Sequence, residues 1–109
     1  MKNLDELTQE IIAFRDARDW QQFHNSKDLA IALSIEASEL LELFLWKDKE
    51  ECNRERLKEE LADVLIYALM LADKQQFDLA EIITEKIKKN AENYPIALSK
   101  GTVKKYRDR

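Results

Sequence analysis

The chain contains a single glycine, Gly101, and a single proline, Pro95, among its 109 residues. Proteins built from β-sheets use glycine and proline in turns and bulges, so this scarcity favours an all-α fold. The phosphate-binding loops of P-loop and Rossmann proteins need several glycines within a few residues. The sequence therefore excludes both of these classes.

The length of 109 residues fits one domain, 1–109, because single cores extend to roughly 100–200 residues before a chain divides. Apolar residues make up 45% of the chain. Small domains bury a smaller share of their surface than large ones, so we expect a partner subunit to help cover the helices.

Apolar residues recur at helical spacing in four segments. The predicted helices cover residues 4–18, Asn25 or Ser26 to about Trp46, the end of the polar stretch 47–56 to about Gln76, and Asp78 to Tyr94. Asp78 and Glu81 resemble a capping box, and Pro95 disfavours helix at the residue before it. Residues 19–25 are predicted to form a loop, and residues 95–109 an ordered basic tail.

The chain has one cysteine, Cys52, and one histidine, His24, which together cannot form a zinc cluster or an intrachain disulfide. The longest uncharged run, residues 64–72, is far shorter than the roughly 20 residues that span a bilayer. The charged N-terminus lacks the apolar stretch of a secretory signal. We expect a soluble cytoplasmic protein in a reducing compartment, without a membrane partner.

Charge is distributed unevenly along the chain. Residues 36–63 hold ten acids and five bases, a net charge of −5, whereas residues 86–109 hold eight bases and two acids, a net charge of +6. A polyanion bound through metal ions needs carboxylates for the cations and basic groups for the remaining phosphate charge. A solvated acidic helix with a basic tail near nucleic acid explains the charges equally well.

Four acids lie where the helical pattern predicts apolar contact. Glu36 falls at the centre of the stripe of Leu29, Leu33, Leu40 and Leu43, and Glu60 falls in that of Leu57, Val64, Tyr67 and Leu71. Glu39 and Asp63 follow these two glutamates at i+3 and lie beside them. Helices joined by a short connection pack antiparallel, so all four carboxylates are expected to converge.

Such a cluster needs cations, because burying one unpaired carboxylate costs several kcal/mol and crowding adds repulsion. Residues 28–46 and 59–72 contain no lysine or arginine. Oxygen ligands suit Mg²⁺, with Mn²⁺ as a possible substitute. Di-iron bundles need Glu-x-x-His motifs, which are absent. The alternative is a solvated seam between diverging helices.

The run from Glu36 to Glu39, followed by that from Glu60 to Asp63, resembles the E-x-x-E and E-x-x-D motifs of MazG-like all-α nucleoside triphosphate pyrophosphohydrolases. The resemblance continues through further elements in the same order: Arg18-Asp19-Trp20 to Phe23-His24, Glu39 to Trp46-Lys47, Glu59 to Tyr67, Lys86 to Asn90, Tyr94-Pro95, and Lys104-Lys105-Tyr106. It is strongest to the dCTP pyrophosphatase branch and the short single-domain bacterial MazG proteins.

The resemblance implies a four-helix bundle completed by a homodimer or homotetramer, and magnesium-dependent hydrolysis of a nucleoside triphosphate to monophosphate and pyrophosphate. Glu36, Glu39, Glu60 and Asp63 would hold the metal and serve catalysis. Other residues would bind substrate: Trp20, His24 and Trp46 at the base, Tyr67 at the sugar, and Lys86, Asn90, Lys105 and Tyr106 at phosphate or sugar. His24 could equally pin its loop.

Two other functions remain open from the sequence. A non-enzymatic helical dimer, such as a regulatory or antitoxin-like module, could bind a basic partner through the acidic pairs. Single-stranded nucleic acid could bind the basic tail and the aromatic residues, but this reading leaves the four acids unexplained. We therefore expect a nucleotide substrate, with dCTP or a related dNTP first, and no stable binding of nucleic acid.

Overall fold

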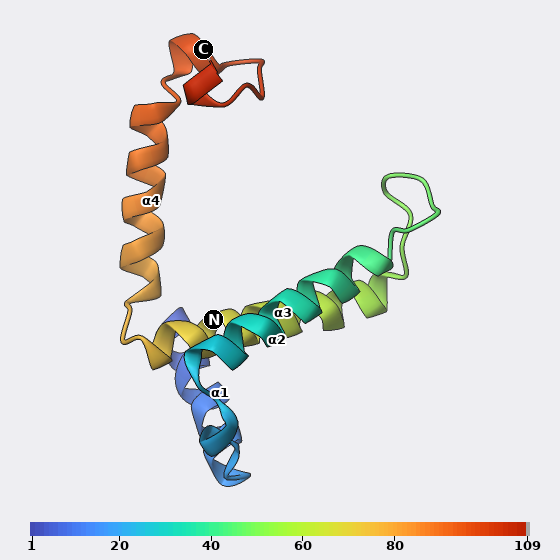
Figure 1. Ribbon diagram of the computed structural model, residues 1–109, viewed down its shortest axis with the longest axis vertical. Helices are drawn as coiled ribbons and strands as arrows, with labels where there is room; N and C mark the ends of the chain where they lie inside the picture. The colour runs from blue at the N-terminus through green and yellow to red at the C-terminus, as the bar shows by residue number, and fades with distance from the viewer. Residues whose placement is uncertain (109) are drawn as a thin grey trace. The chain divides into compact units, whose positions relative to one another are not determined.

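The computed structural model describes residues 1–108, and every regular element in that range is helical (Figure 1). The α-helices are α1 (Leu4–Ala17), α2 (Ser26–Glu42), α3 (Arg54–Lys74), α4 (Leu79–Asn93) and α5 (Ile96–Ser99). Two short 3₁₀ helices are η1 (Trp20–Phe23) and η2 (Tyr106–Asp108). The all-α prediction is confirmed. Across residues 1–108, no helix has both the length and the apolar character needed to cross a bilayer.

A polar side chain caps the start of each of the four long helices. Its side-chain oxygen accepts backbone N–H groups of the first turn at 2.8–3.2 Å. The caps are Asn3, Asn25, Asn53 and Asp78. Each such cap stabilises its helix by about 1 kcal/mol, because it satisfies an N–H group that has no partner within the helix. The predicted caps Asn25 and Asp78 are confirmed.

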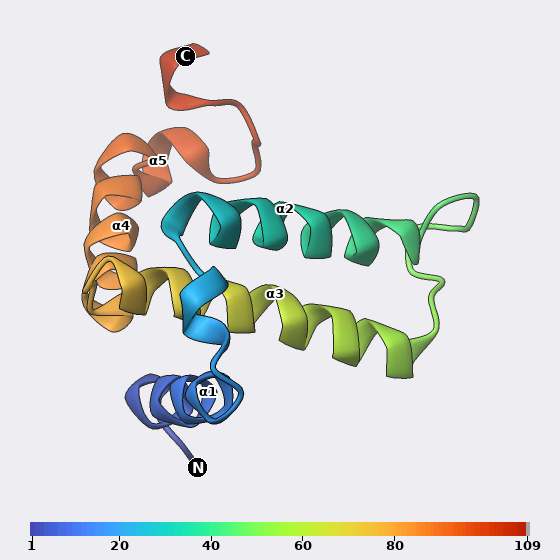
Figure 2. The same cartoon turned by 60° about the horizontal axis from the view of Figure 1, so that its bottom comes forward.

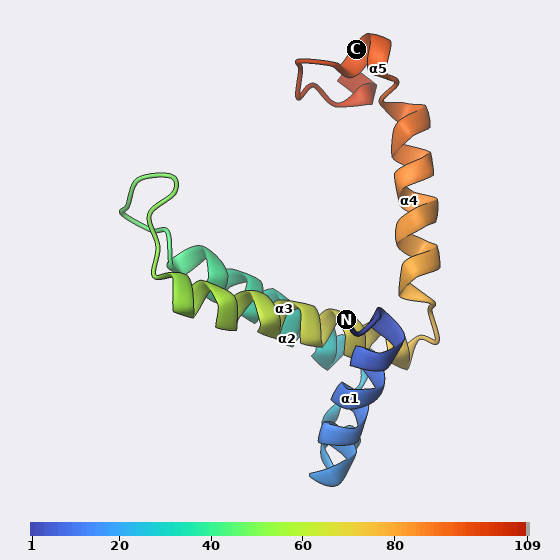
Figure 3. The ribbon, with the colours of Figure 1, turned by 180° about the vertical axis from the view of Figure 1, so that it is seen from behind.

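Helices α2 and α3 run antiparallel and lie side by side (Figures 2 and 3). Helix α1 packs against α3. The core is small, and its buried apolar residues are Leu29, Leu43, Leu69, Met70 and Ala72. The amide Nε2 of Gln75 donates to the hydroxyl of Ser26 at 2.6 Å, which joins the end of α3 to the start of α2. The predicted antiparallel pair is therefore present.

The second helix is shorter than its apolar pattern predicts. It ends at Glu42, not at Trp46, because the next N–H groups bond to carbonyls three residues back, as in Phe44 to Leu41 and Leu45 to Glu42. The chain then leaves the helix, and Trp46 adopts a left-handed backbone with φ 64°. The apolar spacing continues past the end of the helix because Leu43, in the turn, is still buried in the core.

Two further predicted boundaries are corrected. The segment 19–25, predicted to be a loop, contains the 3₁₀ helix η1. Asp19, the residue before η1, has a left-handed backbone conformation with φ 54°. The carbonyl and carboxylate of Asp19 accept hydrogen bonds from the amide of Gln22, which stabilises this tight turn. Helix α3 begins at Arg54, within the stretch predicted to be a linker, because Asn53 caps it there.

The chain forms two compact units, Met1–Phe77 and a second that begins at Asp78. The first contains α1, η1, α2 and α3, and the second contains α4, α5 and η2. At the end of the first unit, Gln76 has φ 59° and the N–H of Phe77 donates to the carbonyl of Ala72 at 2.9 Å. A single domain over residues 1–109 stays a prediction.

Candidate functional site

Three carboxylates from two helices converge in the first unit. Glu36 projects from α2, and Glu60 and Asp63 project from α3, with one oxygen of each within 4.8 Å of the others. Glu39, one turn along α2, is close enough to raise the pKa of both Glu36 and Glu60. The antiparallel packing and the i, i+3 spacing thus gather all four predicted acids.

Two oxygen atoms of the cluster lack the hydrogen bonds that buried polar atoms ordinarily have. The Oε2 atoms of Glu36 and Glu60 are both buried without a hydrogen-bond partner. Arg56 is the one base that forms an ion pair with a carboxylate of the cluster within residues 1–108, at 4.0 Å from Glu60, and its own side chain is exposed. The side chain of Glu60 is only 14% exposed. The cluster therefore holds more negative charge than its surroundings balance.

Burial and the unbalanced negative charge raise the pKa values of three side chains in or beside the cluster. Burial raises the pKa of Glu36 to about 7, a side-chain hydrogen bond with Glu39 adds to the shift, and the charges of Glu39, Asp63 and Glu60 raise it further by repulsion. Burial also raises the pKa of Glu60, followed by the charge of Glu39, while Arg56 opposes the shift. Burial, and then the charges of Glu36, Asp63 and Glu39, raise the pKa of the Tyr67 hydroxyl, which therefore lies beside the cluster.

The donor set fits a divalent metal ion. A cation among these oxygens would bind the unpartnered Oε2 atoms of Glu36 and Glu60. It would also offset the repulsion that contributes to the raised pKa values of these two glutamates. The ligands are all carboxylate oxygens, which are the donors that hard divalent cations prefer. Glu36, Glu60 and Asp63 can contribute one oxygen each to such an ion.

We expect the metal-free protein to lose stability as the pH rises from 5.5 to 8. The pKa of Glu36 is about 7 in the folded chain and 4.5 for an ordinary glutamate, so the folded state binds the proton more tightly. Stability then falls wherever the folded state holds more protons than the unfolded one, from about pH 4.5 to 7. The raised pKa of Glu60 acts in the same direction. Urea unfolding midpoints measured in chelator test this.

The control for this prediction is Glu36→Gln, which removes the titrating group and should flatten the pH dependence. Saturating Mg²⁺ should also weaken it, because a metal ion binds the deprotonated carboxylates and stabilises the folded state more at high pH. A midpoint in chelator that rises between pH 5.5 and 8 would contradict the electrostatic description of the cluster.

A cavity of about 260 Å³ adjoins the carboxylates. It is bounded by α1, η1, α3 and the residue after η1. Its lining residues are Ile11, Phe14, Arg15, Trp20, His24, Asp63, Ile66, Tyr67 and Met70. The structure thus brings together three residues predicted to contact base or sugar, Trp20, His24 and Tyr67, and Asp63 links their cavity to the acidic cluster.

Ring contacts hold the aromatic side chains that line this cavity. Phe14 and Trp20 meet edge to face, with ring centroids 5.9 Å apart. The guanidinium of Arg18 lies over the Phe14 ring, 3.6 Å from its centroid. The Nδ1 atom of His24 is buried without a hydrogen-bond partner, so it does not pin its loop through that atom. Flat apolar faces beside a few polar atoms suit an aromatic heterocycle.

The third predicted base residue, Trp46, lies elsewhere. Its side chain is 100% exposed in the turn that follows α2, and it does not line the cavity with Trp20 and His24. The structure therefore does not place Trp46 with the other aromatic candidates, and its role at a nucleobase stays a prediction.

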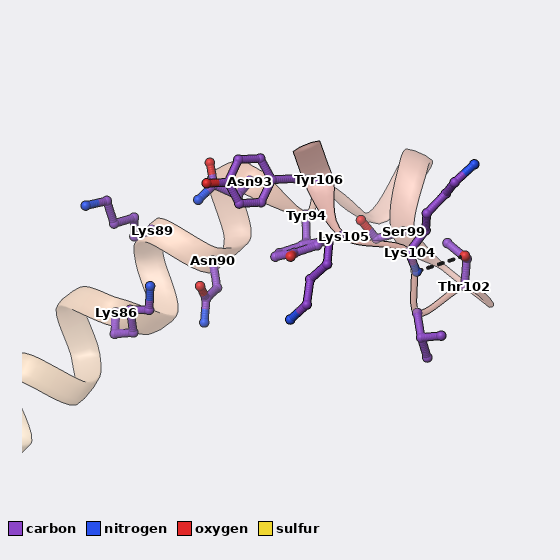
Figure 4. Close-up of a pocket in the computed structure, with 11 residues that line it drawn as sticks. Lys86, Lys89, Asn90, Asn93, Tyr94, Ser99, Thr102, Lys104, Lys105 and Tyr106 are labelled. Atoms are coloured by element: carbon purple, nitrogen blue, oxygen red, sulfur yellow. Dashed lines mark hydrogen bonds between the residues drawn. The ribbon is translucent and has the colours of Figure 1, made fainter. Parts of the chain in front are cut away.

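A separate basic cavity of about 690 Å³ lies in the second unit, between α4 and the segment that follows it (Figure 4). Four predicted phosphate or sugar contacts line it: Lys86, Asn90, Lys105 and Tyr106. In Figure 4, Asn90 and Lys105 point into the same space, with Lys86 beside Asn90. Tyr106 packs edge to face on Tyr94 at 5.5 Å between centroids. The tail is thus folded back onto the end of α4.

Sequence reasoning missed several lining residues. Phe14 and Arg15 line the aromatic cavity, and Lys89 and Asn93 line the basic one. Residues 28–46 and 59–72 contain no lysine or arginine, but α1 supplies Arg15 to the cavity. The available signal was spacing, because Phe14 and Arg15 follow Ile11 at i+3 and i+4 and so share its face.

Comparison with known proteins agrees with the fold and with the motifs. The chain is 44% identical to dCTP pyrophosphatase 1 of Bos taurus over 87% of its own length and 61% of the relative's. It is 42% identical to dCTP pyrophosphatase 1 of Homo sapiens over 85% of its length and 59% of the relative's. The chain thus spans about 60% of the length of these curated relatives.

A solved structure gives the same result for the fold. The crystal structure of a pyrophosphatase from Archaeoglobus fulgidus matches with a TM-score of 0.80 and 37% identity, covering 87% of this chain and 94% of that one. The model of the MazG-like family matches residues 31–108, which include all four acids and every residue of the basic cavity. The chain belongs to the MazG-like family.

Proposed function

We propose that the chain hydrolyses a nucleoside triphosphate to the monophosphate and pyrophosphate with a divalent metal ion, and that dCTP or a closely related dNTP is its substrate. The acidic cluster carries the proposal, because two buried carboxylate oxygens without partners suit a cation. The relatives named dCTP pyrophosphatase 1 support the choice of substrate. Control or cleansing of the nucleotide pool is the role that such a reaction serves.

In the proposed mechanism, Glu36, Glu60 and Asp63 would hold Mg²⁺, with Mn²⁺ as a substitute. A bound ion would neutralise phosphate charge and lower the pKa of an attacking water. Glu39 joins this set as a ligand or takes the proton of that water at a carboxylate oxygen, because it adjoins the two other glutamates. Tyr67, beside the cluster, contacts the sugar.

The remaining substrate groups are assigned to the two cavities. Trp20 and His24 receive the base, since they line the aromatic cavity that Asp63 shares with the metal cluster. Lys86, Asn90, Lys105 and Tyr106 bind phosphate or sugar, because ammonium and amide N–H groups in a basic cavity complement a polyphosphate. Trp46 remains a candidate base contact.

A second copy of the chain is the proposed partner, as a homodimer or homotetramer. Helices α2 and α3 carry apolar side chains that are about half exposed: Ile31, Ile35, Leu61 and Leu65. Contiguous apolar surface on a water-exposed helix is typical of an interface. Mutual burial of these faces would complete the helical bundle.

The direct test is pyrophosphate release from each canonical dNTP and NTP, and from modified dCTP analogues, in the presence of Mg²⁺. We expect dCTP or a modified dCTP to be hydrolysed best, and chelation to abolish turnover, because the carboxylates cannot bind a polyphosphate without a cation. Calorimetry with dCTP and Ca²⁺ separates the alternative function. A helical scaffold for a basic partner would release neither heat nor pyrophosphate.

A further inference from the structure

The wall of the aromatic cavity contains an arginine to which the proposed mechanism gives no role. Arg15 lies on α1 one turn after Ile11, so both side chains project from the face that lines the cavity. The Arg15 side chain is only 14% exposed. Charged side chains are seldom so well covered without partners, since loss of water must be offset by hydrogen bonds.

Asp16 occupies one edge of this guanidinium. The Nε atom donates to Oδ1 of Asp16 at 3.0 Å, and Nη2 lies 2.9 Å from the same oxygen. A guanidinium carries five N–H groups in a rigid planar fork. The outer N–H groups of Nη1 and Nη2 therefore remain, side by side. Among residues 1–108, Asp16 is the one carboxylate that pairs with Arg15, although Asp63 lines the same cavity.

We propose that Arg15 is a specificity-determining residue, whose outer N–H groups donate two parallel hydrogen bonds to O2 and N3 of a cytosine base. This inference rests on the proposed pyrophosphohydrolase function and adds to it the group that selects the base. Cytosine presents O2 and N3 as adjacent acceptors. Thymine and uracil carry a hydrogen on N3, and in adenine the acceptors N1 and N7 each lie beside the N6 amino donor, so neither edge offers two adjacent acceptors.

The dimensions and lining of the cavity agree with one pyrimidine. Its volume of about 260 Å³ is below the roughly 300–1,000 Å³ of sites that hold drug-sized ligands, so it suits a single ring and not a whole nucleotide. Guanine also offers two adjacent acceptors to an arginine, but its double ring needs more room. Phe14 and Trp20 supply flat faces, and Arg15 supplies the hydrogen-bonding edge.

The experiment compares kcat/KM for dCTP, dTTP, dATP and dGTP in the wild type and in Arg15→Met. We expect the value for dCTP to fall roughly 5- to 150-fold and the other three to change little, because a bidentate base contact contributes discrimination of that size. Arg15→Lys should fail to restore the preference, since an ammonium lacks the planar fork. Arg54→Met, which removes an exposed arginine at the start of α3, is the charge-matched control.

A phosphate contact or a structural role predicts a different result. An arginine on phosphate would lower kcat/KM equally for all four substrates, and so would a damaged fold. A uniform loss, or no loss, overturns the proposal while leaving the pyrophosphohydrolase function intact.

Calorimetry of dCMP and dTMP binding gives a readout that needs no turnover. We expect wild-type protein to bind dCMP more tightly than dTMP and Arg15→Met to lose this preference. A wild type that hydrolyses none of the triphosphates would refute the proposed function. The role of Arg15 would be refuted if the wild type bound dCMP and dTMP equally well. It would also be refuted if Arg15→Met still bound dCMP more tightly than dTMP.

Discussion

Replacing Asp63 by asparagine is expected to reduce kcat for pyrophosphate release by about a thousandfold or more, because a lost metal ligand removes several kcal/mol of charge stabilisation from the transition state. Asp63 contributes to both the metal cluster and the aromatic cavity. The substitution keeps the shape of the side chain and removes its charge. Glu39→Gln should cause a loss of similar kind. Steady-state kinetics with saturating Mg²⁺ measure both effects.

Stability separates this loss from damage to the fold. The metal-free Asp63→Asn protein should unfold at a urea concentration no lower than the wild type, because the charge of Asp63 raises the pKa of Glu36 and so repels it. Glu59→Gln, an exposed neighbour of Glu60, removes the same charge outside the cluster and should leave activity unchanged. Full turnover in both Asp63→Asn and Glu39→Gln would eliminate the proposed site.

Placing an aspartate at Leu65 is expected to convert the protein from an oligomer to a monomer at micromolar concentration. Leu65 is 54% exposed in the single chain, on an α3 face that the proposed second copy covers. An unpaired carboxylate buried at such an interface costs several kcal/mol, which is a large share of the free energy of a micromolar association. Sedimentation velocity over a concentration series measures the change.

Ile96→Asp is the matched control, since Ile96 is an exposed aliphatic residue at the start of α5, outside the α2 and α3 faces. Its sedimentation should equal that of the wild type. A wild-type chain that sediments as a stable monomer at micromolar concentration would contradict the proposed partner and the bundle that it completes.

The helices and the acidic cluster were predictable because their causes are local. Caps such as Asn25 and Asp78 act within three residues, and the i, i+3 spacing fixes which acids share a face. The end of α2 was predicted wrongly, because apolar spacing records which residues are buried and not whether the backbone stays helical. Leu43 is buried although it lies in a turn.

The composition of the cavities was less predictable, because it depends on which elements meet. Arg15 reaches the aromatic cavity from α1, and no pattern within α3 reveals that neighbour. Trp20 and Trp46 are both tryptophans beside a predicted helix end, yet Trp20 is 45% exposed and lines the cavity, whereas Trp46 is 100% exposed and does not. Tertiary packing made that distinction.

On the proposed function, the two buried oxygens without partners, on Glu36 and Glu60, would link the abundance of the protein to the supply of a divalent ion. A ligand that binds only the native chain adds about 2.7 kcal/mol of stability at one hundred times its dissociation constant. In a cell depleted of that ion, a larger fraction of molecules would unfold and be degraded by proteases. Scarcity of the ion would then shorten the lifetime of the polypeptide and also stop its catalysis.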